Sequence, residues 1–110
     1  MAKHILIALT NAVEGRDDEF NAWYNNIHLS DVLKVDGFVS AQRFQLSDAQ
    51  RQADPAYRYL AVYEIETDDI GKAVSDLAYQ ADNVMELSDA FDRKRTAMVF
   101  TPITERVTRD

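Results

Sequence analysis

The order in which strand-like and helix-like periodicities follow one another constrains this chain more than any other sequence feature. Apolar residues alternate with polar ones, as in strands, over 3–10, 38–47, 57–66 and 96–103. Apolar residues recur at helical spacing over 17–28 and 67–81. The order β-α-β-β-α-β predicts an α+β, ferredoxin-like fold, in which an antiparallel sheet carries both helices on one face.

Turn-forming residues separate the predicted elements. The first helix ends either at His28 or after a second short turn through 30–35, and Gly37 then provides a left-handed C-cap. The polar stretch 48–55, which ends in proline, predicts a surface loop. Thr67 is the expected N-cap of the second helix.

Residues 82–95 have no clear period, and we predict a short extra helix there. Its apolar members would be Val84, Met85, Leu87 and Phe91. A polar tail follows from residue 104. Because no linker, repeat or low-complexity segment interrupts the chain, we expect a single domain over 1–110.

The predicted strands carry apolar side chains in both directions. In the second strand, one face is expected to hold Phe38, Ser40, Gln42, Phe44 and Leu46, and the other Val39, Ala41, Arg43 and Gln45. Two helices on one side leave the other face of such a sheet without cover. We therefore expect a homodimer in which a second subunit covers that face and more than ~1,000 Å² is buried.

The composition limits the partners and the compartment. The chain has 19 acidic and 12 basic residues, a formal net charge of −7 and a pI near 4.7. This charge repels the phosphates of nucleic acids and of anionic membranes, so a neutral small molecule or another protein is the expected partner. The absence of cysteine suits a reducing, cytoplasmic location. No apolar run is long enough to span a bilayer, and the first residues lack the pattern of a signal peptide.

An aromatic stripe in the first predicted helix leads to one of only two histidines. On a regular helix the positions i, i+3, i+4, i+7 and i+8 share a face, and here they hold Phe20, Trp23, Tyr24, Ile27 and His28. We expect the first four side chains to be buried against the sheet. His28 should then lie at the edge of a pocket, neither fully exposed nor sealed.

His28 is the main candidate for chemistry. An imidazole titrates near neutral pH and can both accept and donate a proton. Asp31 lies one turn further on, where its carboxylate would accept a hydrogen bond from one ring nitrogen and leave the other to face a substrate. The alternative is that His28 caps or packs the C-terminal end of the helix, where a positive charge is favoured.

Several other side chains are candidates for contact with a ligand. The phenols of Tyr24, Tyr59 and Tyr63 would donate hydrogen bonds to a carbonyl or oxyanion, with Tyr63 assigned a catalytic role. The alternative is that they are ordinary strand and helix residues with one hydrated end. The remaining expected pocket walls are Trp23, Gln42 and Phe44.

Arg43 and His4 are further candidates, and no motif indicates a metal or cofactor. Arg43 would either hold an anionic substrate group or pair with Glu64 or Glu66 across the strands. His4 lies alone on the first strand. The two histidines lack the close spacing of metal ligands, the three glycines are not clustered as in a phosphate loop, and there is no G-x-S-x-G motif. We therefore expect no metal and no cofactor.

The stretch 23–44 resembles the signature of the EthD-like family. The resemblance rests on WYNNIHL at 23–29, DVL at 31–33, GF at 37–38 and SAQRF at 40–44, and YLAVYEI at 59–65 is similar to the third strand of such proteins. The chain departs from the pattern at Ser30 and Asp36, where proline is usual. The family belongs to the dimeric α+β barrel superfamily, so the resemblance implies that fold, a homodimer and a functional role for His28. The superfamily includes polyketide cyclases, cofactor-free monooxygenases, muconolactone-type isomerases and haem-degrading enzymes.

The residues and the resemblance together lead to a functional expectation. We expect a cofactor-independent enzyme that acts on a hydrophobic, aromatic or polyketide-like small molecule, with His28 as general acid/base. A lyase, isomerase, cyclase or cofactor-free oxygenase step would suit these groups. Two alternatives remain: a non-catalytic binding or accessory dimer that uses the same pocket, and a structural dimer whose core is filled. A cavity beside His28 that is large enough for a ligand would exclude the second alternative.

Overall fold

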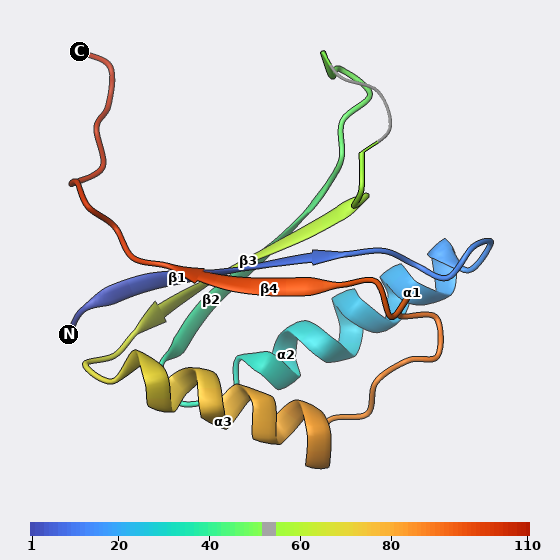
Figure 1. Ribbon diagram of the computed structural model, residues 1–110, viewed down its shortest axis with the longest axis horizontal. Helices are drawn as coiled ribbons and strands as arrows, with labels where there is room; N and C mark the ends of the chain where they lie inside the picture. The colour runs from blue at the N-terminus through green and yellow to red at the C-terminus, as the bar shows by residue number, and fades with distance from the viewer. Residues whose placement is uncertain (52–54) are drawn as a thin grey trace.

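A computed structural model, which describes residues 1–51 and 55–110, contains a four-stranded antiparallel sheet with its helices on one side (Figure 1). The strands are β1 (Lys3–Thr10), β2 (Phe38–Gln45), β3 (Tyr59–Glu66) and β4 (Thr96–Phe100). The helices are α1 (Asp17–Trp23), the π-helical η1 (Tyr24–His28), α2 (Leu29–Val32) and α3 (Ile70–Asn83). This arrangement confirms the predicted α+β, ferredoxin-like fold.

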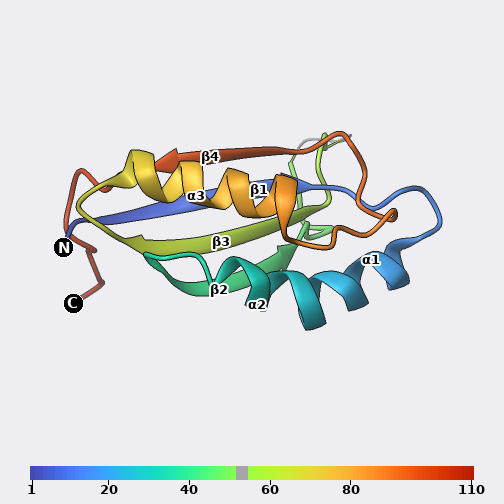
Figure 2. The same cartoon turned by 90° about the horizontal axis from the view of Figure 1, so that it is seen from below.

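The sheet places β1 and β3 at its centre, in the order β2-β3-β1-β4. β3 pairs with β1 along its whole length, from Lys3 opposite Glu66 to Thr10 opposite Tyr59. Figure 2 shows α3 and the helix formed by α1, η1 and α2 lying in front of this sheet. The side chains between the two layers form the core, which includes Leu6, Phe20, Tyr24, Phe38, Tyr63 and Ile65. None of the described helices is long and apolar enough to cross a membrane.

The strands are shorter than predicted. β2 ends at Gln45 rather than at residue 47, β3 begins at Tyr59 rather than 57, and β4 ends at Phe100 rather than 103. The pairing of β2 with β3 ends at Gln45 opposite Tyr59. The pairing of β1 with β4 ends at Ile5 opposite Phe100. The alternation in the sequence therefore continues past the point where a neighbouring strand supplies hydrogen bonds. Part of the predicted loop 48–55, residues 52–54, lies outside the described residues.

The turn before α3 also differs from the prediction. The N-cap is Asp69, whose Oδ1 accepts a hydrogen bond from the backbone N–H of Lys72 at 3.0 Å. Thr67 Oγ1 accepts a hydrogen bond from the backbone N–H of Asp69, also at 3.0 Å. Thr67 therefore stabilises the turn that leads into the helix, and the assignment of Thr67 as the cap is wrong by two residues. Gly37 has the expected positive φ, 94°.

The short helix predicted within 82–95 is absent. α3 continues to Asn83, and the segment 84–95 is irregular apart from an isolated bridge between Ala12 and Phe91. Ala90 is fully buried, and Met85, Leu87 and Phe91 pack against the core, whereas Val84 is exposed. These apolar residues cover the core from an irregular segment, and such a segment shows no helical period.

A β-bulge corrects the predicted faces of β2. Phe38 pairs with Ile65 and Ser40 with Glu64, so Val39 is an extra residue on β2. The extra residue reverses the alternation, and Phe38 is buried on the helical side instead of sharing the outer face with Ser40. From Ser40 onward the two predicted faces hold.

The outer face of the sheet, on the side away from the helices, is mainly apolar and has no cover within the described chain. By the register of the strands, it carries Ile5, Ile7, Leu9, Phe44, Leu60, Val62, Met98 and Phe100. Phe44, Met98 and Phe100 are each more than 40% exposed. The C-terminal residues 101–110 extend away from the sheet on the same side (Figure 1). Contiguous apolar surface of this kind marks an interaction site.

Candidate active site

A π-helical turn in the first helix determines which side chains face the sheet. Such a turn bonds residue i to residue i+5 and so adds one residue relative to an α-helix. The ring of His28 stacks on Trp23, five residues earlier, with centroids 4.7 Å apart and planes inclined by 22°. His28 is 8% exposed and Ile27 is 44% exposed, so the expectation that Ile27 is buried is wrong. The inserted residue turns His28 inward and Ile27 outward.

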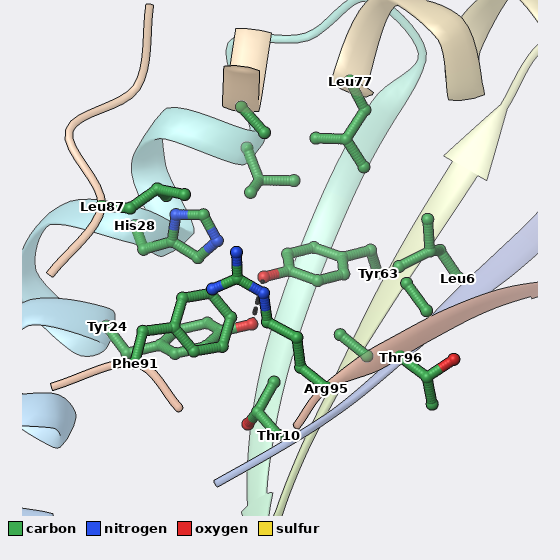
Figure 3. Close-up of a pocket in the computed structure, with 14 residues that line it drawn as sticks. Leu6, Thr10, Tyr24, His28, Tyr63, Leu77, Leu87, Phe91, Arg95 and Thr96 are labelled. Carbon is green, nitrogen blue, oxygen red and sulfur yellow. Dashed lines mark hydrogen bonds between the residues drawn. The ribbon is translucent and has the colours of Figure 1, made fainter. Parts of the chain in front are cut away.

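A cavity of about 230 Å³ lies beside His28, between the helices and the sheet (Figure 3). Its apolar walls include Leu6, Ala8, Val32, Leu77, Ala81 and Leu87. Its polar groups include Tyr24, His28, Tyr63 and Arg95, and Figure 3 shows the guanidinium group of Arg95 between the imidazole and the two phenols. Because the core beside His28 is not filled, the alternative of a purely structural dimer with a filled core is excluded.

The imidazole of His28 is held in its neutral form. Burial lowers its pKa from the ordinary value of 6.5 to about 4, the carboxylate of Asp31 opposes this shift, and the charges of Arg95 and Arg43 add to it. Its Nδ1 atom is buried and has no hydrogen-bond partner among the described residues. At neutral pH the ring is therefore an uncharged proton acceptor in an apolar environment.

The expected hydrogen bond between Asp31 and His28 is not formed. Asp31 Oδ1 instead accepts a hydrogen bond from Lys34 Nζ at 3.4 Å, and its side chain is partly exposed. The π-helical turn has rotated the imidazole inward, whereas α2 leaves the carboxylate at the surface. Asp31 acts on His28 through space, by favouring the protonated ring. The stacked ring of Trp23, rather than a carboxylate, fixes the orientation of the imidazole.

Tyr24 and Tyr63 form a pair of phenols at the cavity wall. Their hydroxyl groups lie 3.1 Å apart in a buried hydrogen bond (Figure 3). Burial raises the pKa of both groups, so both remain protonated at neutral pH. In such a pair one O–H donates to the other oxygen, and the second O–H remains available to a ligand.

Arg43 lies behind this pair rather than in the cavity. Its guanidinium carbon is 4.3 Å from the centroid of the Tyr24 ring, and its Nη1 donates to Asn25 Oδ1 at 2.8 Å. The alternative cross-strand ion pair with Glu64 is not formed, because Glu64 accepts a hydrogen bond from Ser40 on the opposite face of the sheet. Within residues 1–51 and 55–110, Nε and Nη2 of Arg43 are buried and have no hydrogen-bond partners.

The other predicted ligand contacts lie outside the cavity. Trp23 is behind His28, and its Nε1 donates to the backbone oxygen of Glu86 at 3.0 Å. The Tyr59 hydroxyl donates to Asp17 Oδ2 at 2.6 Å, away from the cavity lining.

Gln42 and Phe44 are on the outer face of β2, so their assignment to the pocket wall is wrong. The alternation of the strand separates them from Ala41 and Arg43, which face the helices. His4 contacts Thr101 through Nδ1, at 2.8 Å from Oγ1, and does not line the cavity either.

Sequence reasoning missed the contribution of the segment 84–95. Leu87, Phe91 and Arg95 all line the cavity, and the guanidinium carbon of Arg95 lies 3.9 Å from the centroid of the Phe91 ring. The segment has no period, and Arg95 follows Arg93 and Lys94, so nothing in the sequence distinguishes it from its neighbours. In the part of the chain that the structure describes, no three His, Asp or Glu side chains are grouped as metal ligands would be.

Comparisons with known proteins support the fold. No protein-family profile matches the sequence, and a comparison with curated proteins also finds no match. Among solved structures, an EthD-family protein from Bacillus halodurans aligns with a TM-score of 0.64 and 13% identity, over 92% of this chain and 99% of that one. The chain therefore shares the fold of this EthD-family structure.

Two enzymes share this fold with the chain. The haem degrader MhuD from Mycobacterium tuberculosis, solved with two haems in its active site, aligns with a TM-score of 0.65 and 15% identity, over 94% of this chain and 99% of that one. SnoaB, a cofactor-independent oxygenase from Streptomyces nogalater, aligns with a TM-score of 0.60 and 15% identity, over 96% and 97% of the two chains. At these identities the likeness concerns the fold alone.

Proposed function

We propose that this protein is a cofactor-independent enzyme that acts on a hydrophobic, aromatic or polyketide-like small molecule, with His28 as general acid/base. One observation carries the proposal: a neutral imidazole lines an apolar cavity that also holds a pair of protonated phenols. A pocket with apolar walls and a few convergent polar groups of perturbed pKa is the usual form of an active site. The cysteine-free sequence supports a cytoplasmic location.

The arrangement suits proton abstraction next to an oxygen-bearing group. In the proposed step, His28 accepts a proton from an acidic C–H or O–H of the ligand, and the ligand oxygen gains the negative charge. The free O–H of the Tyr24–Tyr63 pair donates to that oxygen. The imidazolium later returns the proton. Such a step is common to isomerase, cyclase, lyase and cofactor-free oxygenase reactions.

The size of the cavity favours a ligand of one or two rings. At about 230 Å³ it is smaller than the ~300–1,000 Å³ of typical sites for drug-sized ligands. A tetrapyrrole such as haem is larger than a ligand of one or two rings. The haem chemistry of MhuD is therefore not part of this proposal, whereas the cofactor-independent chemistry of SnoaB is consistent with it.

Replacing Tyr63 with phenylalanine tests the role of the phenol pair. Because the variant lacks one O–H at the cavity, we expect kcat on an accepted substrate to fall by about 10²-fold. Tyr59→Phe is the matched control, since it also loses a tyrosine hydrogen bond but lies outside the cavity. Candidate substrates are screened with the unmodified protein by product detection, and the two variants are then compared. Equal activity of both variants would contradict the assigned role of Tyr63.

The apolar outer face supports the proposal that the protein is a homodimer. A second sheet packed on this face would bury Val62 at its centre and Phe44 near its edge, and the projecting residues 101–110 would flank the second copy. We expect light scattering at micromolar concentration to give twice the chain mass of 12.5 kDa.

Val62→Glu should shift the protein to monomers, because it places a charge in the buried interface. Tyr79→Glu adds the same charge to an exposed position of α3 and should leave the dimer intact. A monomeric unmodified protein, or a Val62→Glu variant that remains dimeric, would contradict the proposed interface.

A further inference from the structure

The local charge of the cavity is opposite to that of the whole protein. The chain carries seven more acidic than basic residues, yet no acidic side chain is among the described residues that line the cavity, and Arg95 is. Arg43 adds a second positive charge behind the wall formed by Tyr24. The three ion pairs among the described residues involve neither arginine. The two guanidinium groups therefore leave a positive charge without a carboxylate partner at one end of the cavity.

The position of Arg95 leaves its hydrogen-bond donors available. One face of the guanidinium is occupied by the ring of Phe91, at 3.9 Å from its centroid. All five N–H donors of a guanidinium lie in its plane, so stacking does not use them. Figure 3 shows this group directed toward the phenols of Tyr24 and Tyr63 and toward His28. A planar, two-oxygen anion is the group that such donors bind best.

We infer that the ligand of this cavity is a small aromatic acid bound as its anion, with its carboxylate on Arg95 and its ring among the apolar walls. The inference rests on the proposed function for the site and adds the class of ligand. It differs from the expectation, drawn from net charge alone, that the small-molecule partner is neutral. The apolar end, lined by Leu6, Leu77 and Ala81, would receive the ring.

Binding of an anion also makes His28 a better proton acceptor. In the free protein the charges of Arg95 and Arg43 contribute to the lowered pKa of the imidazole. A carboxylate on Arg95 offsets that positive charge, so the pKa of His28 should rise when the acid binds. The same ligand group would therefore provide both affinity and activation of the base.

The inference is tested with a pair of probes that differ in charge. Binding of 2-naphthoate and 2-naphthamide is measured by titration calorimetry at pH 7 with the full chain. Hydrogen bonds to charged groups are stronger than those between neutral ones, so we expect naphthoate to bind about tenfold more tightly. Because Arg95 is exposed, the preference should shrink as sodium chloride is added.

Two arginine variants locate the source of the preference. Arg95→Gln should reduce it to about twofold or less, whereas Arg93→Gln, which removes an exposed arginine outside the cavity, should retain it. Equal affinities for the two probes, tighter binding of the amide, no binding of either, or an undiminished preference in Arg95→Gln would each overturn the inference.

A third variant separates this inference from the proposed function. His28→Gln should still prefer naphthoate, because binding of the probe requires no proton transfer. A preserved preference together with turnover that does not depend on His28 would overturn the proposed function and leave the ligand class intact. The opposite result would be turnover of a neutral substrate that depends on His28, in a protein that does not prefer naphthoate. That result would overturn the ligand class and leave the proposed function intact.

Discussion

Replacement of His28 with glutamine is expected to lower turnover by about 10²–10⁴-fold, because glutamine keeps the polarity and approximate size of the ring but cannot accept a proton. The free energy of unfolding at neutral pH should change by only about 1 kcal/mol. The variant loses the stacking on Trp23, worth about 0.5–1.5 kcal/mol, but also removes the buried Nδ1 atom that has no partner. Product formation and urea-induced unfolding, measured on the same preparation, check the two parts.

Two further variants serve as controls for this prediction. Ile27→Gln places the same side chain at the adjacent, exposed position of the π-helical turn, so it should retain activity. Asp31→Asn removes only a through-space charge and should reduce turnover much less than His28→Gln. Strong destabilisation of His28→Gln, or full activity on an accepted substrate, would show that the histidine is structural.

Acidification from pH 6.5 to pH 4 is expected to remove about 3 kcal/mol more unfolding free energy from the unmodified protein than from His28→Gln. The pKa of His28 is about 4 in the folded protein, and the ordinary value of 6.5 applies in the unfolded chain. The unfolded chain therefore binds the proton first as the pH falls. Stability therefore falls with decreasing pH through this window. Above about pH 7.5, one unit above the ordinary pKa of 6.5, the imidazole is neutral in both states and contributes almost no pH dependence.

Urea unfolding at intervals across this range measures the effect as a difference between the two proteins. All other ionisable groups are the same in both proteins, so their contributions largely cancel in the difference. The two stability curves should run parallel above about pH 7.5 and diverge steadily below it. Curves that remain parallel down to pH 4 would contradict the burial of a neutral His28.

The sequence predicted the order of elements and the fold because each strand and helix keeps its own period over most of its length. Ile5, Ile7 and Leu9 alternate as the pleat requires, and the amphipathic spacing of α3 needs no knowledge of its neighbours. The resemblance at 23–44 agreed with the same fold. Periodicity alone thus accounts for the two-layer arrangement.

The site was predicted only in part, because single-residue insertions shift a period without leaving a signal in composition. Tyr24, His28 and Tyr63 line the cavity as expected, but the π-helical turn moved Ile27 outward and left Asp31 at the surface. In the same way, the bulge at Val39 moved Phe38 to the helical side of the sheet.

Contacts made by the irregular segment 84–95 were beyond the reach of a periodic pattern. Phe91 and Arg95 reach the cavity because the segment is tied to the loop after β1, through the backbone bond from Val13 to Ala90 and the bridge from Ala12 to Phe91. Such long-range pairings depend on the assembled fold. Arg95, the one cationic side chain among the described residues of the cavity lining, was for that reason not among the predicted site residues.

The pH dependence of kcat/KM tests the central claim most directly, because it reports the pKa of the essential base in the free enzyme. Rates are taken immediately after a jump to each pH, before unfolding, for the unmodified protein and for His28→Gln. After correction for ionisation of the substrate's own carboxyl group, the account predicts an acidic limb with an apparent pKa of about 4, the value that burial gives to His28, and no such limb in the residual activity of the variant. A corrected limb near 6.5, or one that persists unchanged in His28→Gln, would contradict the assignment of His28 as the catalytic base.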